Sequence, residues 1–237
     1  MLPVAILAGG LATRLRPLTE TIPKALVEIN GKPFIAHQLR LLRTNGIEQV
    51  IICAGYLGEM IQEWMGDGTR FGLCVEFAFD GPQLLGTAGA VKRVLPGLGR
   101  AFFVLYGDSY LPCDYRAVQT AFEPSGRQAL MTVFHNQGHW DTSNVEYVSE
   151  RIVAYDKRNP TPRMHHIDYG LGVFSAAALA SWPQGKAFDL ADVYRDLIAR
   201  HELAGFEVAH RFYEVGSPEG LAELDAVLRR KQLSAAP

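Results

Sequence analysis

The stretch VAILAGGLATRLRPLTETIPK, which runs from Val4 to Lys24, decides the fold of this chain. Its first four residues form an apolar run of the kind found in a buried parallel strand. Gly9 and Gly10 then allow the backbone to turn tightly and to present N–H groups to an anion. Arg14 offers two parallel donors to phosphate oxygens, and Lys24 is a movable positive charge. A glycine pair after a strand also fits a plain turn, but the two cations favour a cradle for the phosphates of a nucleotide.

Strand-like runs alternate with helix-like runs through the first half of the chain. Residues Pro33 to Asn45, for example, carry Ile35, Leu39 and Leu42 at close to a helical period, and Gly46 follows in a capping position. Such alternation is typical of a parallel sheet flanked by helices, so we expect the α/β class with one Rossmann-like, doubly wound sheet that is mixed once the later strands are included. The expected strands are residues 4–7, 50–54, 75–79 and 101–106. The expected helices are residues 33–45 and 56–65, and residues 86–94 are expected to form a loop that enters a helix.

The pattern changes in the second half, where isolated strands separated by polar loops are expected at residues 129–135, 144–148 and 168–174. A last helix is expected at residues 219–231, with Leu221, Leu224 and Leu228 on one side. No linker or repeat divides the chain. We therefore expect a single domain over residues 1–237, with a nucleotide-binding half at 1–115 and a second, substrate-binding half at 116–237.

Composition describes an ordinary soluble protein. The 237 residues are 48% hydrophobic and 20% charged, with a net charge of −2, and the sequence pI of about 6.4 gives no basic footprint for nucleic acid. No apolar run approaches the length of a membrane span, and Met1 leads directly into the first strand, so we expect a cytoplasmic protein with no membrane partner. Cys53, Cys74 and Cys113 lack metal-ligand spacing, which favours reduced thiols.

The polar motifs of the first half fall where a doubly wound sheet binds its ligands, beyond the carboxyl ends of the strands. Gly9 follows the first strand, Gly86 precedes a helix, and Asp108 follows the strand at 101–106. A carboxylate in that position suits Mg²⁺, although a turn aspartate is the structural alternative.

These motifs together resemble one family. The residues Gly9, Gly10, Arg14, Pro17, Thr19, Pro23 and Lys24 are similar to the signature of the sugar-1-phosphate nucleotidyltransferases, the pyrophosphorylases that make NDP-sugars. The resemblance implies the GT-A-like fold of the nucleotide-diphospho-sugar transferases, and transfer of a nucleotidyl group from an NTP to a sugar 1-phosphate with Mg²⁺ as cofactor. Ala12 departs from the family, which usually has glycine there, and a stiffer loop is expected.

The resemblance also implies a nucleotide site. Arg14, Lys24 and Asp108 become the catalytic set, with Lys24 on the α-phosphate and Arg14 on the leaving pyrophosphate. The segment LGTAGA resembles the nucleoside-binding loop of the family, although a tight turn before a helix would look the same. The expected nucleotide-binding residues are Leu7, Ala8, Gly9, Gly10, Gln83, Gly86 and Thr87.

The resemblance further implies a metal site and a site for the sugar phosphate. Asp108 corresponds to one metal-binding acid of the family, and Glu214 in FYEVGSPEG stands where the family has a second, usually aspartate. Lys157 matches the lysine on the sugar-linked phosphate, although a solvated lysine before a turn is the competing interpretation. The expected sugar-phosphate residues are Asn144, Glu146, Lys157, Asp168 and Gly170.

The substrates are less well defined. LAGG with LGTAGA is most similar to guanylyltransferases acting on mannose- or heptose-type 1-phosphates, which favours GTP. The stretch DGTRFGL at residues 67–73 instead resembles small uridylyltransferases such as that for N-acetylmuramate 1-phosphate, and a glucose 1-phosphate type is a related alternative. A GT-A glycosyltransferase or a non-catalytic nucleotide sensor represents another class. Exposed apolar faces on the later strands are compatible with a homodimer.

Overall fold

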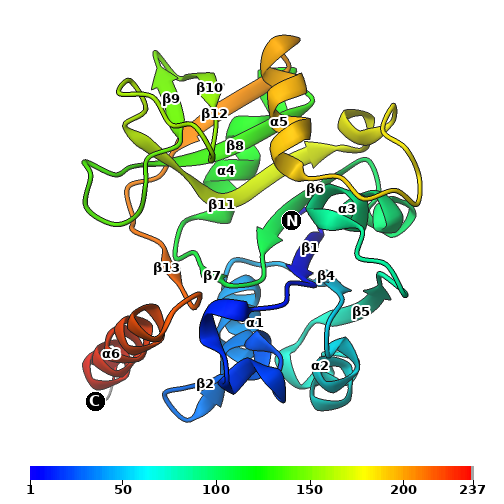
Figure 1. The fold of residues 1–237 in the computed structure, drawn as a ribbon, viewed down its shortest axis with the longest axis vertical. Helices are drawn as coiled ribbons and strands as arrows, with labels where there is room; N and C mark the ends of the chain where they lie inside the picture. Colours follow the sequence, from blue (N-terminus) through cyan, green and yellow to red (C-terminus); the bar gives the residue numbers. More distant parts are fainter. Residues whose placement is uncertain (236–237) are drawn as a thin grey trace.

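A nine-stranded mixed sheet forms the centre of the protein in the computed structural model, which describes residues 1–235 (Figure 1). Four of its strands are parallel neighbours in the order β6, β1, β4, β5. Their carboxyl ends therefore meet at one edge of the sheet, as expected from their apolar runs. These strands are β1 (Val4–Ala8), β4 (Gln49–Ala54), β5 (Cys74–Phe79) and β6 (Ala101–Tyr106).

The later strands, which polar loops separate in the sequence, extend this same sheet, and this confirms the expected single mixed sheet. Strand β11 lies antiparallel to β6 on one side and to β8 on the other, and β12 adds parallel to β8. The hairpin of β9 and β10 joins the end of β11. The reason is that nearly all of β11 is buried, so it needs a neighbour on each side. These strands are β8 (Ala129–His135), β9 (Val145–Val148), β10 (Arg151–Tyr155), β11 (His166–Ser175) and β12 (Leu203–Glu207).

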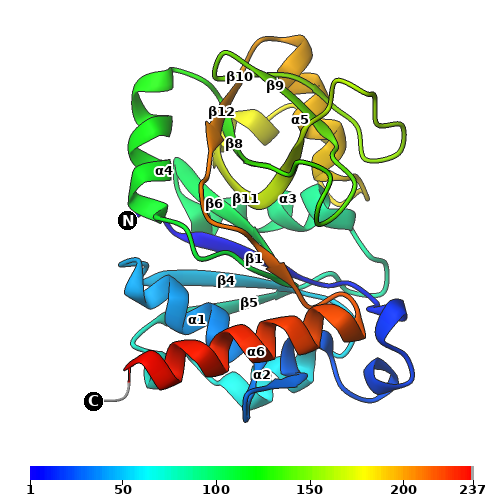
Figure 2. The same ribbon diagram turned by 90° about the vertical axis from the view of Figure 1, so that its left-hand side faces the viewer.

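Helices cover both faces of the sheet, which confirms the doubly wound α/β class (Figure 2). Alternate residues of β1 enter two different cores: Val4 and Ile6 pack toward α1, α2 and α4, whereas Ala5 packs toward α3 and α5. The first layer is α1 (Phe34–Thr44), α2 (Gly58–Met65) and α4 (Tyr115–Phe122), and the second is α3 (Gly86–Leu98) and α5 (Leu190–Ala199). Helix α3 begins at Gly86 itself, without the loop expected there.

The end of the chain returns to the first half. Strand β13 (Tyr213–Glu214) pairs antiparallel with β7 (Ser109–Tyr110), directly after β6. Helix α6 (Pro218–Ala235) then packs Leu224 and Leu228 into a small core with Phe34 at the start of α1 (Figures 1 and 2). The helix begins one residue earlier than expected and continues past residue 231; the last two residues of the predicted tail lie outside the described part.

Short elements complete the described chain. They are β2 (Glu28–Ile29), β3 (Lys32–Pro33) and the 3₁₀ helices Thr13–Leu15, Leu18–Glu20, Lys24–Leu26, Thr69–Phe71, Glu123–Ser125 and Ala176–Leu179. All three cysteines are free thiols, as predicted. Within residues 1–235, no helix has the length and apolar character needed to cross a bilayer.

Candidate functional site

A cavity of about 300 Å³ opens at the carboxyl edge of the four parallel strands. Both halves of the chain contribute to its wall, because Asp189, just before α5, lines it together with the turn after β1. Most of the predicted nucleotide-binding residues line it. The lining includes Leu7, Ala8, Gly9, Gly10, Lys24, Cys53, Tyr56, Asp80, Leu84, Gly86, Thr87, Tyr106, Asp108 and Asp189.

Close backbone packing shapes the floor of this cavity. A Cβ atom on Gly107 would lie 2.4 Å from the carbonyl oxygen of Leu7, and one on Gly55 would lie 2.7 Å from that of Gly9. Both distances are far below van der Waals contact, so only glycine fits at Gly55 and Gly107. The turns after β1, β4 and β6 are thus held against one another.

The loop after Gly10 contains a strained residue at the position where the sequence departs from the family pattern. Ala12 has φ 48° and ψ 40°, in the left-handed region that favours glycine. Two hydrogen bonds to its carbonyl oxygen hold it there, from the Thr19 hydroxyl at 2.7 Å and from the Leu15 N–H at 3.1 Å. The loop is therefore fixed at a cost in backbone strain.

Lys24 and Asp108 meet inside the cavity. The Lys24 ammonium lies 3.0 Å from Oδ2 of Asp108, with only 18% of the lysine side chain and 33% of the aspartate side chain exposed. The Ser109 hydroxyl donates to the other carboxylate oxygen at 3.3 Å. The sequence predicted both residues for the site, and the structure brings them into direct contact.

Glu214 is brought to the same place by the pairing of β13 with β7. It stands opposite Ser109 in the register, and the Val215 N–H donates to the Asp108 carbonyl at 2.9 Å. Burial and then the charges of Asp108 and Asp141 raise the pKa of Glu214 to about 7, against the opposing effect of Lys157 and Arg14. Two acids thus share one small region, although Asp108 and Glu214 are 106 positions apart in the sequence.

This pair of acids fits a divalent cation. Burial, and after it the negative charge of Asp108, raise the pKa of Glu214, and a bound cation would offset both effects. No cluster of three or more His, Cys, Asp or Glu side chains suited to a metal occurs in the described residues. Mg²⁺ commonly uses only one or two carboxylates together with waters and substrate phosphates, so Asp108 and Glu214 suit it in number and kind.

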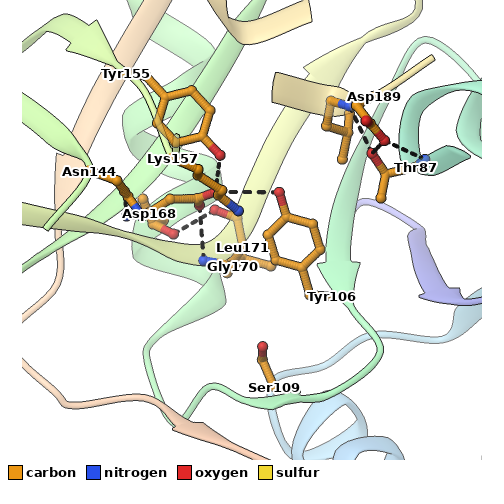
Figure 3. A network of polar contacts seen from close by, with 12 residues as sticks. Thr87, Tyr106, Ser109, Asn144, Tyr155, Lys157, Asp168, Gly170, Leu171 and Asp189 are labelled. Carbon is orange, nitrogen blue, oxygen red and sulfur yellow. Dashed lines mark hydrogen bonds and ion pairs between the residues drawn. The ribbon is translucent and has the colours of Figure 1, made fainter. Parts of the chain in front are cut away.

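A second polar cluster centres on Asp168 in β11 (Figure 3). Its Oδ2 accepts hydrogen bonds from the hydroxyls of Tyr155 at 3.0 Å and Tyr106 at 3.3 Å, and lies 3.3 Å from the ammonium of Lys157. Its Oδ1 accepts from the Gly170 N–H at 3.1 Å. Four protein donors therefore hold this carboxylate, whose side chain is only 1% exposed. The contact of Asp168 with sugar hydroxyls stays a prediction. In such a contact, the sugar hydroxyls would bind the carboxylate alongside these four donors.

Lys157 is positioned by the same cluster. Its ammonium lies 4.8 Å from the ring centre of Tyr106, in addition to its ion pair with Asp168. Burial raises the pKa of Tyr106 and of Tyr155, and the Asp168 charge adds to that effect, so both hydroxyls stay protonated and donate. Lys157 is thus a lysine with two fixed partners rather than a freely solvated one.

The remaining sugar-phosphate candidates surround this cluster. The Asn144 side-chain oxygen accepts from the Asp168 N–H at 3.0 Å. Glu146 is buried in β9 and pairs with Arg163 at 3.3 Å. Gly170 has φ 95°, and a Cβ there would lie 3.1 Å from the Tyr106 ring, so glycine is required for both conformation and space.

The nucleoside-binding loop is tied to the second half. The Thr87 hydroxyl donates to Asp189 at 3.3 Å and accepts from the Leu190 N–H at 2.8 Å (Figure 3). The Phe188 carbonyl accepts hydrogen bonds from the N–H groups of Ala88 and Gly89 at the start of α3. Gln83 is exposed and does not line the cavity. Of the predicted loop residues, Gly86 and Thr87 reach the cavity and Gln83 does not.

Arg14 lies in a neighbouring cavity of about 530 Å³ that Glu214 also lines. Its guanidinium stands 3.1 Å from the position of a Cβ on Gly216. Arg211 lines the same cavity, stacked on Trp140 with 3.3 Å from its guanidinium carbon to the ring centre and paired with Glu223 of α6. The predicted cations therefore stand on two sides of the acid pair: Lys24 in one cavity, Arg14 in the other.

Sequence reasoning missed two carboxylates of the first cavity, Asp80 and Asp189. Asp80 directly follows β5, just as Asp108 follows β6, so the rule that singled out Asp108 also applies to Asp80. Asp189 has no comparable signal, because only the folding of the 186–190 segment onto α3 brings it to the cavity.

Comparison with known proteins adds a family match. Residues 4–143 match the family described as Nucleotidyl transferase. The chain is 28% identical over 225 residues to the N-acetylmuramate alpha-1-phosphate uridylyltransferase of Neisseria meningitidis serogroup B, covering 94% of this chain and 96% of that protein. It is also 28% identical over 230 residues to the mannose-1-phosphate guanylyltransferase of Mycobacterium tuberculosis, covering 95% of this chain but only 64% of that protein.

A solved structure supports the fold. The inositol-1-phosphate CTP transferase from T. maritima matches with a TM-score of 0.79 at 21% identity, covering 100% of this chain and 98% of that one. This likeness concerns the path of the backbone alone.

Proposed function

The chain belongs to the nucleotidyl transferase family, and we propose that it is an enzyme that joins an NTP and a sugar 1-phosphate into an NDP-sugar and pyrophosphate. Both curated relatives are named for nucleotidyl transfer to a sugar 1-phosphate. The observation that carries the proposal is the ion pair of Lys24 with Asp108 at the carboxyl edge of the sheet, together with the strand pairing that sets Glu214 opposite Ser109, the next residue of the chain.

The proposed reaction needs positioning and charge neutralisation. An oxygen of the sugar-linked phosphate attacks the α-phosphorus in line, the bond to the β-phosphate breaks, and pyrophosphate leaves with the electron pair. The attacking phosphate is already ionised at neutral pH, so no covalent protein nucleophile is required. The chain must chiefly align two anions and stabilise the charge that develops between them.

The proposed roles follow the positions of the cations. Lys24 exchanges its contact with Asp108 for the α-phosphate, and Arg14 binds the leaving pyrophosphate from the neighbouring cavity. Lys157, held by Asp168, binds the phosphate of the sugar substrate. We propose that Asp108 and Glu214 together hold Mg²⁺, which supplies positive charge to the reacting phosphates when it is bound.

The substrates proposed are GTP and a mannose- or heptose-type 1-phosphate. The similarity of LAGG and LGTAGA to guanylyltransferases and the 28% identity to a mannose-1-phosphate guanylyltransferase support this choice. The alternative is UTP with N-acetylmuramate or glucose 1-phosphate, which the match over 96% of a small uridylyltransferase favours.

A substrate matrix tests the proposal. Four NTPs are combined with a panel of sugar 1-phosphates in the presence of Mg²⁺, and products are identified by mass alongside pyrophosphate release. We expect at least one pair to give an NDP-sugar with equimolar pyrophosphate. Nucleotide binding without any product would indicate a sensor, and sugar transfer from an NDP-sugar to another acceptor would indicate a glycosyltransferase; either result would overturn the proposal.

A further inference from the structure

Asp80 stands at the far end of the first cavity from the catalytic pair. The strand order β6, β1, β4, β5 places Asp108 at the end of the first of these strands and Asp80 at the end of the last. Three strand spacings, about 14 Å in total, separate the ends of these two strands, and the Asp80 side chain extends from its strand end toward the turn after β1. A nucleotide with its phosphates at Lys24 therefore extends its base toward Asp80.

The surroundings of Asp80 suit a flat, partly apolar ring. Its Oδ2 lies 3.7 Å from the position of a Cβ on Gly9, so the carboxylate stands directly beside the glycine turn. The nearby side chains of the lining are Cys53, Tyr56 and Leu84. An aromatic base can pack on such a surface while its polar edge reaches the carboxylate.

The Asp80 carboxylate has acceptor capacity to spare. Only 9% of the residue is exposed, and its Oδ2 accepts one hydrogen bond, from the Leu85 N–H at 3.1 Å. The nearest cation, Arg93, donates to the backbone carbonyl of Asp80. Within residues 1–235, Oδ1 has no hydrogen-bond donor. Burial raises the pKa of this carboxyl, as expected for a buried acid without a full set of donors.

The nucleobases differ in what they offer to such a group. Guanine carries two adjacent donors, N1–H and the N2 amino group, which match the two oxygens of one carboxylate. Uracil offers a single N–H between two carbonyl oxygens. One carboxylate oxygen would then face a carbonyl oxygen, which cannot donate a hydrogen bond to it. A site built to accept two donors discriminates strongly against a base that lacks one of them.

We propose that Asp80 is the residue that selects the base, accepting N1–H and N2–H of guanine and thereby making the chain selective for GTP over UTP. This inference rests on the proposed function, because it takes the first cavity as the nucleotide site. It goes further by assigning the choice of nucleotide to one side chain.

Inosine triphosphate isolates the interaction, because it differs from GTP only by the missing N2 amino group. Affinities of the Mg²⁺-containing protein for GTP, ITP and UTP are measured by calorimetry, and kcat/KM is measured for each. In the wild type we expect GTP to exceed ITP by about 10- to 100-fold and UTP by more. Wild-type protein that binds ITP or UTP as tightly as GTP would overturn the proposal without any variant.

Asp80→Asn separates base selection from a merely structural role. The asparagine oxygen still accepts from the Leu85 N–H, while its amide N–H₂ now faces the donors of guanine. We expect the GTP to ITP ratio to fall to within about threefold of unity and the relative affinity for UTP to rise. A folded Asp80→Asn protein that keeps the wild-type ratio would contradict the proposal.

Two controls accompany this variant. Glu76→Gln removes an exposed acid of the same strand and should leave both ratios unchanged. Asp189→Asn changes the other missed acid of the cavity, whose Oδ1 is held by Thr87, and should preserve the GTP to ITP ratio whatever its activity. Because binding is measured as well as turnover, the two proposals can fail separately. Loss of the GTP preference in binding would contradict base selection, whereas selective binding without any product would contradict nucleotidyl transfer.

Discussion

Lys157 owes its position to Asp168, whose carboxylate is saturated by donors of the protein itself. The sequence around Lys157 alone favours a solvated lysine before a turn. What the sequence could not show is that Tyr106, Tyr155 and Lys157, from three separate segments, converge on one carboxylate. This convergence depends on β11 lying between β6 and β8.

Asp168→Asn tests this arrangement at the scale of one residue. The amide cannot pair with Lys157, so the lysine should lose its fixed position while keeping its charge. We expect KM for the sugar 1-phosphate to rise about 10-fold or more, with a much smaller change in KM for the NTP. Tyr155→Phe, which removes one donor only, should show a weaker effect of the same kind. Equal changes in both KM values would contradict a positioning role.

Glu214 makes stability depend on pH. Its pKa is raised from 4.5 to about 7 in the folded protein, so the folded state binds the proton more tightly than the unfolded state. Its stabilising contribution is present below pH 4.5 and is lost as pH rises through 7.

Glu214→Gln removes this dependence. Without Mg²⁺, we expect the variant to gain up to about 3 kcal/mol in free energy of unfolding relative to wild type between pH 5 and pH 8. Urea unfolding of both proteins in EDTA measures the difference, and Mg²⁺ should stabilise the wild type more than the variant. A difference between the two proteins that does not change with pH would contradict the assignment.

At the scale of elements, the sequence predicted the parallel strands well because each is an apolar run with its own local signal. It placed Gly9 and Asp108 near one another because both follow strands that end at one edge, but it did not predict the ion pair of Asp108 with Lys24. It did not predict α4, α5 or β12. The signal for α5 was present, since Leu190, Val193, Tyr194 and Leu197 recur at helical period and are buried.

Other contacts had no local signal. The pairing of β13 with β7 involves only two residues from each strand, and it decides where Glu214 lies. The packing of residues 186–190 on α3 likewise depends on the folded chain, because backbone groups make most of its contacts. Such features follow from the global arrangement and not from periodicity.

Ala12 provides a prediction for the signature loop. Glycine adopts its left-handed conformation without steric cost, although it also has more freedom in the unfolded chain. We expect Ala12→Gly to stabilise the protein slightly, by up to about 1 kcal/mol. The same substitution at Ala121, inside the right-handed helix α4, should instead cost about 1 kcal/mol. Thermal unfolding of both variants compares them, and a destabilised Ala12→Gly protein would contradict the strain inferred here.

At the scale of the whole molecule, the last part of the chain packs against the first half beside the candidate site. The chain that supplies Glu214 leads directly into α6, and α6 packs against elements of the first half. The two halves expected on either side of residue 115 therefore share their hydrophobic cores. The expected cytoplasmic location and homodimer stay predictions; sedimentation analysis would measure the oligomeric state.

Leu224 tests the importance of the last helix. It is fully buried against the core that contains Ile29, Phe34 and Tyr110. Truncation should leave a cavity, so we expect Leu224→Ala to lower the free energy of unfolding by about 2–4 kcal/mol. Leu233→Ala, at a position 76% exposed on the same helix, is the matched control and should change stability by less than about 0.5 kcal/mol. Similar unfolding curves for the two variants would contradict the packing of α6.

The most direct test of nucleotidyl transfer at this site is the rate of pyrophosphate release by Lys24→Ala, with the NTP and sugar 1-phosphate that the wild type uses best. Lys32→Ala, which removes an exposed lysine outside the cavity, is the control. We predict a loss of about 10²- to 10³-fold for Lys24→Ala and an unchanged rate for Lys32→Ala. A folded Lys24→Ala protein that releases pyrophosphate at the wild-type rate would contradict nucleotidyl transfer at this site.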